Sequence, residues 1–154
     1  MNYFVLLQMI MDEPTCVQLL EQHGIKATSN RILVVKALAA EERPSTMSEL
    51  EDKILTIDKS GIFRCLMLFR DQHLVHAIED GDGAMRYELC MSHGDDHDDD
   101  MHVHFYCEHC HQLFCLYGTP VPTVDLPEGY RMQTANYMVK GLCPACAHKM
   151  KGGR

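Results

Sequence analysis

The sequence lacks four features that would assign it to a large class of proteins. No apolar run approaches the ~20 residues that a membrane-spanning helix needs. The apolar opening, Met1–Met11, carries no basic residue and ends in Asp12-Glu13-Pro14, so it makes a poor signal peptide. There is also no nucleophile, base and orienting residue in a recognisable arrangement, and no phosphate-binding loop. We therefore expect a cytoplasmic protein that is neither an enzyme nor a membrane protein, with Met11 as an alternative start.

Lysine and arginine are scarce. The chain has 14 of them against 22 acidic residues, which gives a formal net charge of −8. This balance argues mildly against nucleic acid as a partner. The charge is uneven, however, because five aspartates lie between residues 95 and 100. A solvated acidic loop is the favoured interpretation of that cluster, although bound cations would offset its charge and His93 and His97 leave open a weak or transient metal role.

Cysteine, in contrast, is abundant. Without a signal peptide, the eight cysteines are read as metal ligands and free thiols rather than as disulfides. Two Cys-x-x-Cys pairs are separated by residues 111–142, and each such turn can present two sulfurs to one ion, so that two turns complete a tetrahedral cage. This spacing favours a structural zinc site over buried free thiols. The expected ligands are Cys107, Cys110, Cys143 and Cys146.

The N-terminal part shows the pattern of short helices followed by a hairpin. Pro14 and Gly24 delimit the first helix, Ser29 is the expected N-cap of the second, and a capping box at Thr46–Glu49 opens the third. Two strand-like runs then flank a Gly/Asp turn. This order predicts a winged helix-turn-helix, the alternative being a small bundle with an appended ribbon. The expected helices cover residues 14–23, 29–40, 47–55 and 58–73, and the expected strands 74–78 and 84–89.

The fourth helix is the candidate for entering a DNA major groove. Ile62, Leu66 and Phe69 share one stripe at core spacing, whereas Phe63 and Arg64 fall on a different face. An exposed aromatic can contact a thymine methyl or a sugar, and arginine can reach phosphate or guanine. A place for Phe63 in the core is the alternative. The predicted DNA-contacting residues are Lys59, Ser60, Phe63 and Arg64.

The C-terminal part reads as a small α/β or mainly β unit. Strands are expected at 103–107, 113–117 and 137–139, the last delivering Cys143 and Cys146 to the cage. A short sheet leaves an unpaired edge strand, which could pair with a second copy of the chain in a dimer. The fold class is therefore α+β. The expected domains are a winged-helix domain at 1–89, an acidic hinge loop at 90–101 and a zinc-stapled dimerisation domain at 102–154.

Five short motifs in a fixed order carry a resemblance to a known family. From about Glu13 to His148 the chain resembles the ferric uptake regulator (Fur) superfamily of bacterial metal-dependent repressors, and the zinc-sensing branch within it. The resemblance implies an N-terminal winged-helix domain, a C-terminal dimerisation domain, a two-fold homodimer and a palindromic double-stranded DNA operator. The motifs are Gly24-Ile25-Lys26-Ala27-Thr28 with Arg31, Gly61-Ile62-Phe63-Arg64-Cys65-Leu66, Arg86-Tyr87-Glu88-Leu89, His102-x-His104-x-x-Cys107-x-x-Cys110 and Gly141-x-Cys143-x-x-Cys146.

The resemblance also implies roles for individual residues. The four cage cysteines match the family's structural zinc site. Glu88, His102 and His104 align with ligands of a regulatory metal site at the hinge between the domains, where a divalent ion could fix the angle between two DNA-binding heads. Strand alternation puts both histidines on the same face. Phe63 and Arg64 align with the DNA-contacting Tyr-Arg pair, here with phenylalanine in place of tyrosine.

The sequence departs from the family pattern at several ligand positions. Met101, Val103 and Ala135 replace ligands of the secondary metal site, which we expect to be absent. Pro44-Ser45 occupies the turn where the first domain would offer a histidine to the regulatory site. Cys90 could supply the missing ligand, and the two histidines of the acidic loop could substitute. Thiolate together with imidazole would favour zinc over iron or manganese.

These residues predict a metal-dependent transcriptional regulator, most simply a repressor, with a structural zinc and a second divalent metal. Two alternatives stay open. The effector could be iron, haem or an oxidant, or the protein could buffer metal through the acidic loop and keep a vestigial DNA-binding head. Cys115 could be a ligand, a redox thiol or a core residue, and core is favoured. Cys16 and Cys65 are also read as core.

Overall fold

The computed structural model describes residues 11–41, 43–90, 102–133 and 135–152. The chain divides into two compact units, Met1–Met91 and Ser92–Arg154. The predicted acidic hinge, with His93 and His97, lies outside the described residues except for Cys90. Within the described ranges, every helix is too short or too polar to cross a lipid bilayer.

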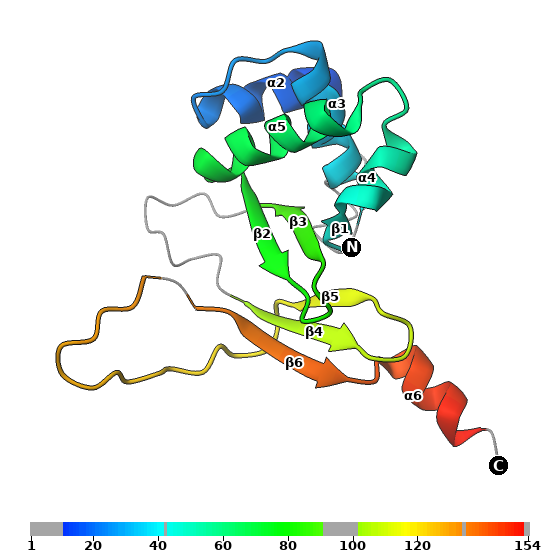
Figure 1. Ribbon diagram of the computed structural model, residues 1–154, viewed down its shortest axis with the longest axis vertical. Helices are drawn as coiled ribbons and strands as arrows, with labels where there is room; N and C mark the ends of the chain where they lie inside the picture. The colour runs from blue at the N-terminus through cyan, green and yellow to red at the C-terminus, as the bar shows by residue number, and fades with distance from the viewer. Residues whose placement is uncertain (1–10, 42, 91–101, 134, 153–154) are drawn as a thin grey trace. The chain divides into compact units, whose positions relative to one another are not determined.

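The first unit has the topology of a winged helix-turn-helix (Figure 1). Its antiparallel sheet has the strand order β1-β3-β2, so the hairpin is paired to a strand that precedes the third helix. This pairing ties the hairpin into the domain, and the alternative of an appended ribbon is therefore wrong. The elements are α2 (Glu13–Gln22), α3 (Ser29–Ala39), β1 (Ser45–Thr46), α4 (Met47–Lys53), α5 (Lys59–Asp71), β2 (Val75–Glu79) and β3 (Met85–Leu89).

The helix starts follow from local hydrogen bonds. The capping box of α4 is confirmed, since Thr46 accepts from the Glu49 N–H while the Glu49 carboxylate accepts from the Thr46 N–H. Asp58 caps α5 by accepting from the Gly61 N–H at 3.0 Å. The predicted cap of α3 is wrong by one residue. Thr28, not Ser29, has the extended backbone of an N-cap, and its hydroxyl accepts from the Arg31 N–H.

Two predicted helix ends are also corrected. The third helix ends at Lys53 rather than near Leu55, because Ile54 leaves the helical region at φ −102° and ψ 81°. The fourth ends at Asp71, and His73 adopts a left-handed conformation at φ 59° that stops the helix. The strand β1 was not expected, since two residues are too few to show an alternating pattern.

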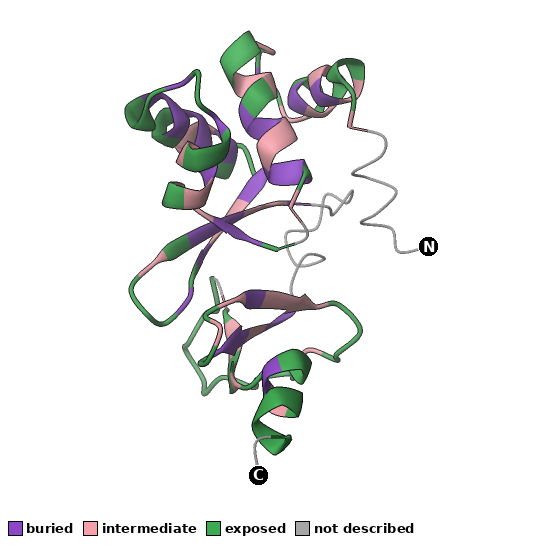
Figure 2. Ribbon diagram, turned by 90° about the vertical axis from the view of Figure 1, so that its right-hand side faces the viewer, coloured by how far each residue is buried: buried purple, intermediate pink, exposed green. Residues whose placement is uncertain are grey.

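One core fills the first unit, and α5 contributes its centre. Ile62, Leu66 and Phe69 are fully buried, which confirms the predicted stripe. Cys16 and Cys65 are buried in the same cluster, as expected. Figure 2 shows buried residues on the inner sides of the helices of the first unit and exposed residues on their outer sides. Because the stripe faces inward, the opposite side of α5 remains available to a partner.

A buried ion pair shapes the β2–β3 hairpin. Asp80 is only 1% exposed and accepts a 3.1 Å hydrogen bond from Arg86 Nε. The same carboxylate also accepts from the N–H groups of Asp82 and Ala84, which closes the turn between the strands. Burial raises the pKa of Asp80, but these three donors outweigh it and hold the pKa below its ordinary value. One carboxylate thus fixes the conformation of the hairpin.

Replacing Asp80 with asparagine should destabilise the first unit by about 3–5 kcal/mol, because the buried Arg86 would lose its counter-charge. The depressed folded pKa means that the carboxylate's contribution is fully present above the ordinary value of 3.8 and is lost as pH falls through the lower folded value. Urea unfolding of Asp80→Asn followed by circular dichroism measures both effects. Asp82→Asn, in the same turn, is the matched control, and equal stability of the two variants would contradict the assignment.

The second unit is built on the three-stranded sheet β5-β4-β6 (Figure 1). The strand β4 pairs antiparallel with β5 and parallel with β6, so β4 is central. The three predicted strands are confirmed, although β5 ends one residue early and β6 runs two residues further. The C-terminal helix was not expected; it contains the predicted ligand Cys146, and the predicted ligand Cys143 is its N-cap residue. The elements are β4 (Val103–Cys107), β5 (Leu113–Leu116), β6 (Tyr137–Gly141) and α6 (Pro144–Lys151).

Candidate metal centres and DNA-facing helix

The four predicted cage cysteines come together in the second unit. Their sulfur atoms all lie within 4.8 Å of one another. The Cys110 and Cys143 sulfurs are 3.9 Å apart. Four sulfurs at about 2.3 Å from one zinc ion lie about 3.8 Å from each other, so the observed spacing fits a tetrahedral zinc site. Three of the four side chains are buried and Cys110 is half-buried, so most of the cluster is shielded from solvent.

The turn after β4 and the start of α6 position these sulfur atoms toward one another. Cys107 ends β4, and the following turn returns at His111, whose left-handed backbone (φ 59°) lets its N–H bond to the Cys107 carbonyl at 2.9 Å. On the other side, Cys143 is the N-cap residue of α6 and Pro144 occupies the first helical turn. The Cys143 N–H donates to the Cys107 sulfur at 3.3 Å, which joins the two halves directly.

The protein environment separates the proton affinities of two cage thiols. Burial opposes ionisation of Cys107, but N–H groups of Cys110, Cys143 and His109 point at its sulfur and lower its pKa to about 6. Burial and the neighbouring sulfurs raise the pKa of Cys146 to about 12. The N–H groups that lower the pKa of Cys107 favour its thiolate, which is the form of cysteine that binds a metal ion.

A second group of metal-binding side chains lies on the other face of β4. Alternation along the strand puts His102 and His104 on one face, as predicted, and puts Cys107 on the other face. Both histidines are buried, and their ring centroids are 4.2 Å apart. Cys115 is the direct partner of His104 across β4 and β5, so its side chain shares this face. Ligand atoms of the three residues lie within 4.8 Å of one another.

The position of Cys115 corrects its assignment to the core. Its side chain is half-buried and belongs to neither hydrophobic cluster found among the described residues. From the sequence alone the residue was one cysteine on a strand, and only the register with His104 places its sulfur beside the imidazoles. The signal available in the sequence was the strand alternation of both elements, but their register could not be read from it.

The other predicted regulatory ligands, Glu88 and Cys90, belong to the first unit. Glu88 lies on β3 directly opposite His76 on β2, so an imidazole and a carboxylate share one face of that sheet. His76 was not among the ligands predicted from the sequence. Cys90 is buried, and its N–H donates to the Leu74 carbonyl at 2.7 Å. Whether Glu88 and Cys90 take part in a regulatory site stays a prediction.

The exposed side of α5 carries the four predicted DNA-contacting residues. Phe63 is 48% exposed, which excludes it from the core. Lys59, Ser60 and Arg64 are exposed as well and occupy the same N-terminal half of the helix. Gly61 is buried in this turn, and a Cβ there would lie 2.7 Å from Ile57 Cγ2, so the close packing of the turn requires glycine.

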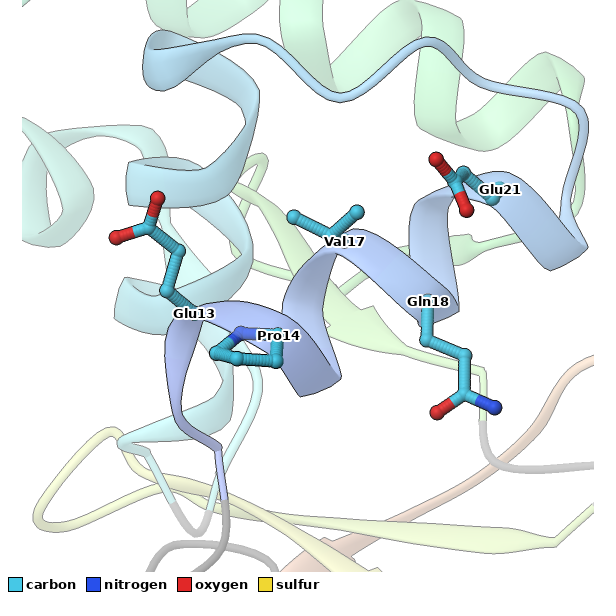
Figure 3. Close-up of a pocket in the computed structure, with 5 residues that line it drawn as sticks. All are labelled: Glu13, Pro14, Val17, Gln18 and Glu21. Atoms are coloured by element: carbon cyan, nitrogen blue, oxygen red, sulfur yellow. The ribbon is translucent and has the colours of Figure 1, made fainter.

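A shallow surface pocket of about 560 Å³ lies elsewhere, along α2 (Figure 3). It is lined by Glu13, Pro14, Val17, Gln18 and Glu21, all from that helix. Two separated carboxylates on an open surface make no recognisable binding site. The pocket includes none of the predicted functional residues.

The protein thus combines a winged-helix unit with a small sheet, and its side chains form two clusters of candidate metal ligands. The Ferric uptake regulator family matches residues 22–119, and the chain belongs to that family. Members of the family are transcription regulators, not enzymes, and this protein is accordingly a metal-responsive transcriptional regulator.

Known relatives agree on the fold. The chain is 22% identical over 141 residues to the peroxide operon regulator of Bacillus subtilis (strain 168), covering 86% of this chain and 92% of the relative. A zinc uptake regulator solved with zinc and DNA matches with a TM-score of 0.64 at 16% identity over 98% of this chain and 99% of that one. The ferric uptake regulator of Vibrio cholerae matches with a TM-score of 0.60 at 20% identity, over 82% and 98% respectively.

Proposed function

We propose that this protein is a zinc-dependent transcriptional repressor that binds palindromic operator DNA in the cytoplasm as a homodimer. The observation that carries the proposal is the pair of donor clusters on opposite faces of β4. The thiol cluster would hold a structural zinc, and the imidazole face would hold a regulatory divalent ion. Two sites of different chemistry allow one ion to maintain the fold while the other reports metal supply.

Donor chemistry supports zinc as the regulatory metal. His102 and His104 supply imidazole nitrogens, which suit zinc and also copper, nickel and iron. Glu88 and Cys90, with His76 opposite Glu88, are the candidate ligands of the first unit. A thiolate in the set would shift preference toward zinc and away from iron or manganese. If Glu88 or Cys90 bound the same ion as the two histidines, the ion would restrain the movement of one unit against the other.

The exposed side of α5 supports DNA as the partner. Lys59 and Arg64 would contact phosphates or guanine, and Phe63 would contact a sugar or a thymine methyl. In a two-fold dimer, two such helices would meet a palindromic site one helical turn apart or a multiple of it. A zinc uptake regulator of similar fold has been solved in complex with zinc and DNA, which supports this partner.

The experiment that tests the function is a gel shift on DNA upstream of the protein's own gene, at buffered free zinc. We expect zinc to raise the DNA affinity about 5–150-fold, the usual range of coupling between two ligands. The affinity should fall steeply with salt, because phosphate contacts release counterions. DNA affinity that does not respond to zinc, iron or manganese would refute the proposal and leave metal buffering as the better explanation.

Removal of the Arg64 side chain should weaken operator binding by about 1–3 kcal/mol, the cost of losing one base or phosphate contact. Metal content should not change, because Arg64 lies on α5 and not on the second unit. The measurement is a titration of operator DNA by fluorescence anisotropy. Arg131→Ala removes the same charge from an exposed position in the second unit and is the control. Operator affinity equal to wild type in Arg64→Ala would mean that α5 does not contact the DNA.

A peroxide response is the second candidate function, favoured by the curated relative named for its peroxide operon. In that case iron, not zinc, would fill the regulatory site, and hydrogen peroxide would release DNA only from the iron-loaded protein. Comparing iron-loaded and zinc-loaded protein before and after peroxide separates the two functions. Peroxide insensitivity of both forms favours the zinc response.

A further inference from the structure

We propose that Tyr106 is a positioning residue for the cysteine cage, and that its hydrogen bond to His111 keeps the turn after β4 closed around a bound zinc ion. Opening of this turn moves Cys110 away from the ion first, so the Tyr106–His111 pair sets the rate at which zinc leaves the cage. The inference rests on the proposed structural zinc. Neither Tyr106 nor His111 belongs to the clusters of candidate ligands found among the described residues.

The four cage cysteines differ in how the fold holds them. Three are fixed by regular secondary structure, because Cys107 ends β4, Cys143 is the N-cap residue of α6 and Cys146 lies within that helix. Cys110 lies in the turn after β4 and is half-buried, whereas the other three are buried. Cys110 is therefore the ligand that can leave the ion with the smallest rearrangement of the second unit.

The turn that carries Cys110 contains a strained residue. His111 follows it directly and has a left-handed backbone at φ 59°, in which the Cβ of a residue other than glycine crowds the main chain. This conformation lets the His111 N–H donate to the Cys107 carbonyl at 2.9 Å, which closes the turn. A strained backbone persists only where its surroundings hold it in place. The turn would relax and open if His111 lost that restraint.

The side chain of Tyr106 supplies the restraint. Its hydroxyl and His111 Nδ1 are 2.9 Å apart and hydrogen-bonded. The tyrosine side chain is itself held in place, since Tyr106 is only 3% exposed. Lys140 is its partner across β4 and β6, and the lysine Nζ lies 5.9 Å from the centroid of the ring, within the range of a cation–π contact. The strand fixes the hydroxyl, and the hydroxyl holds the turn.

The test follows the loss of zinc from the full chain, purified with its zinc, in an excess of iodoacetamide. The reagent alkylates a cage cysteine that has left the ion, and the coloured chelator 4-(2-pyridylazo)resorcinol reports the zinc released. Tyr106→Phe removes only the hydroxyl and should raise the release rate about 2–10-fold, which corresponds to the loss of one hydrogen bond. Tyr130→Phe removes a hydroxyl from a 71% exposed position in the same unit and should release zinc at the wild-type rate.

The order of alkylation separates positioning of the turn from a general loss of stability. Peptide mass spectrometry should find Cys110 alkylated before Cys143 and Cys146 in the wild type and in Tyr106→Phe, with the first step faster in the variant. Simultaneous alkylation of the three residues would overturn the proposal, because the second unit would then open as a whole. A wild-type release rate in Tyr106→Phe would overturn it as well.

A second variant tests whether the hydroxyl acts through His111. His111→Gly removes the imidazole ring and leaves the left-handed backbone without strain. Adding Tyr106→Phe to this variant should not change the release rate further, because the hydroxyl has already lost its partner. A further 2–10-fold increase in the double variant would mean that the hydroxyl acts elsewhere, which would overturn the proposal.

The two proposals fail in different ways. Wild-type protein purified without zinc would refute the structural site and the role of Tyr106 together. Protein that holds zinc, and releases it at the same rate with and without the Tyr106 hydroxyl, would keep the proposed function and refute only the role of Tyr106. Faster release in Tyr106→Phe, combined with DNA affinity that no metal changes, would support the role of Tyr106 and refute the repressor function.

Discussion

Cys107→Ser should abolish the folding of the second unit. The side chain is fully buried, its sulfur accepts the Cys143 N–H, and it sits among three other sulfurs. Apparent binding free energies of about 10–16 kcal/mol hold structural zinc in small domains, and without the ion such domains unfold. We expect the wild type to retain about one chelator-resistant zinc per chain, and the variant to lose both this zinc and the dimer.

Zinc analysis and sedimentation of the purified proteins measure this result. Cys65→Ser is the matched control, because it makes the same change at a buried cysteine that is distant in sequence from the cage. It should keep its zinc and its oligomeric state, with only a modest loss of stability. A Cys107→Ser protein that is dimeric and contains a full equivalent of zinc would show that the cluster is not a structural site.

Joint replacement of His102 and His104 by alanine should remove the metal response while leaving the fold intact. The two imidazoles lie on the face of β4 opposite the cage, so the structural zinc should remain. Without them the regulatory ion loses two donors, and DNA affinity should no longer increase about 5–150-fold with metal. Anisotropy titrations of operator DNA with and without zinc, together with zinc content, measure both parts of the prediction.

His148→Ala provides the control for this experiment. His148 is an exposed histidine of α6 in the same unit, outside both clusters. It should respond to metal as the wild type does. If the double variant of His102 and His104 also gained DNA affinity on addition of zinc, the regulatory site would have to lie elsewhere in the protein.

Much of this protein could be predicted from short-range patterns, because the physics behind them is local. The capping box at Thr46 and the buried stripe of α5 depend on residues within one or two helical turns. The paired Cys-x-x-Cys turns show their ligand role through spacing alone. A helix start predicted in this way can be wrong by a residue or two when neighbouring residues could both be the N-cap. This happened at the start of α3, where the hydroxyls of Thr28 and Ser29 were equally good candidates for the cap.

Local sequence patterns were enough to predict the winged-helix order, the four cage cysteines and the common face of His102 and His104. The pairing of the strands was needed to show that Cys115 lies beside His104 and that Glu88 lies opposite His76. The physical reason is strand register. The alternation of side chains along each strand can be read from the sequence, but the pairing register of two strands cannot. A shift of one residue in the register moves every side chain of a strand to the other face, and the packing of the whole sheet sets the register.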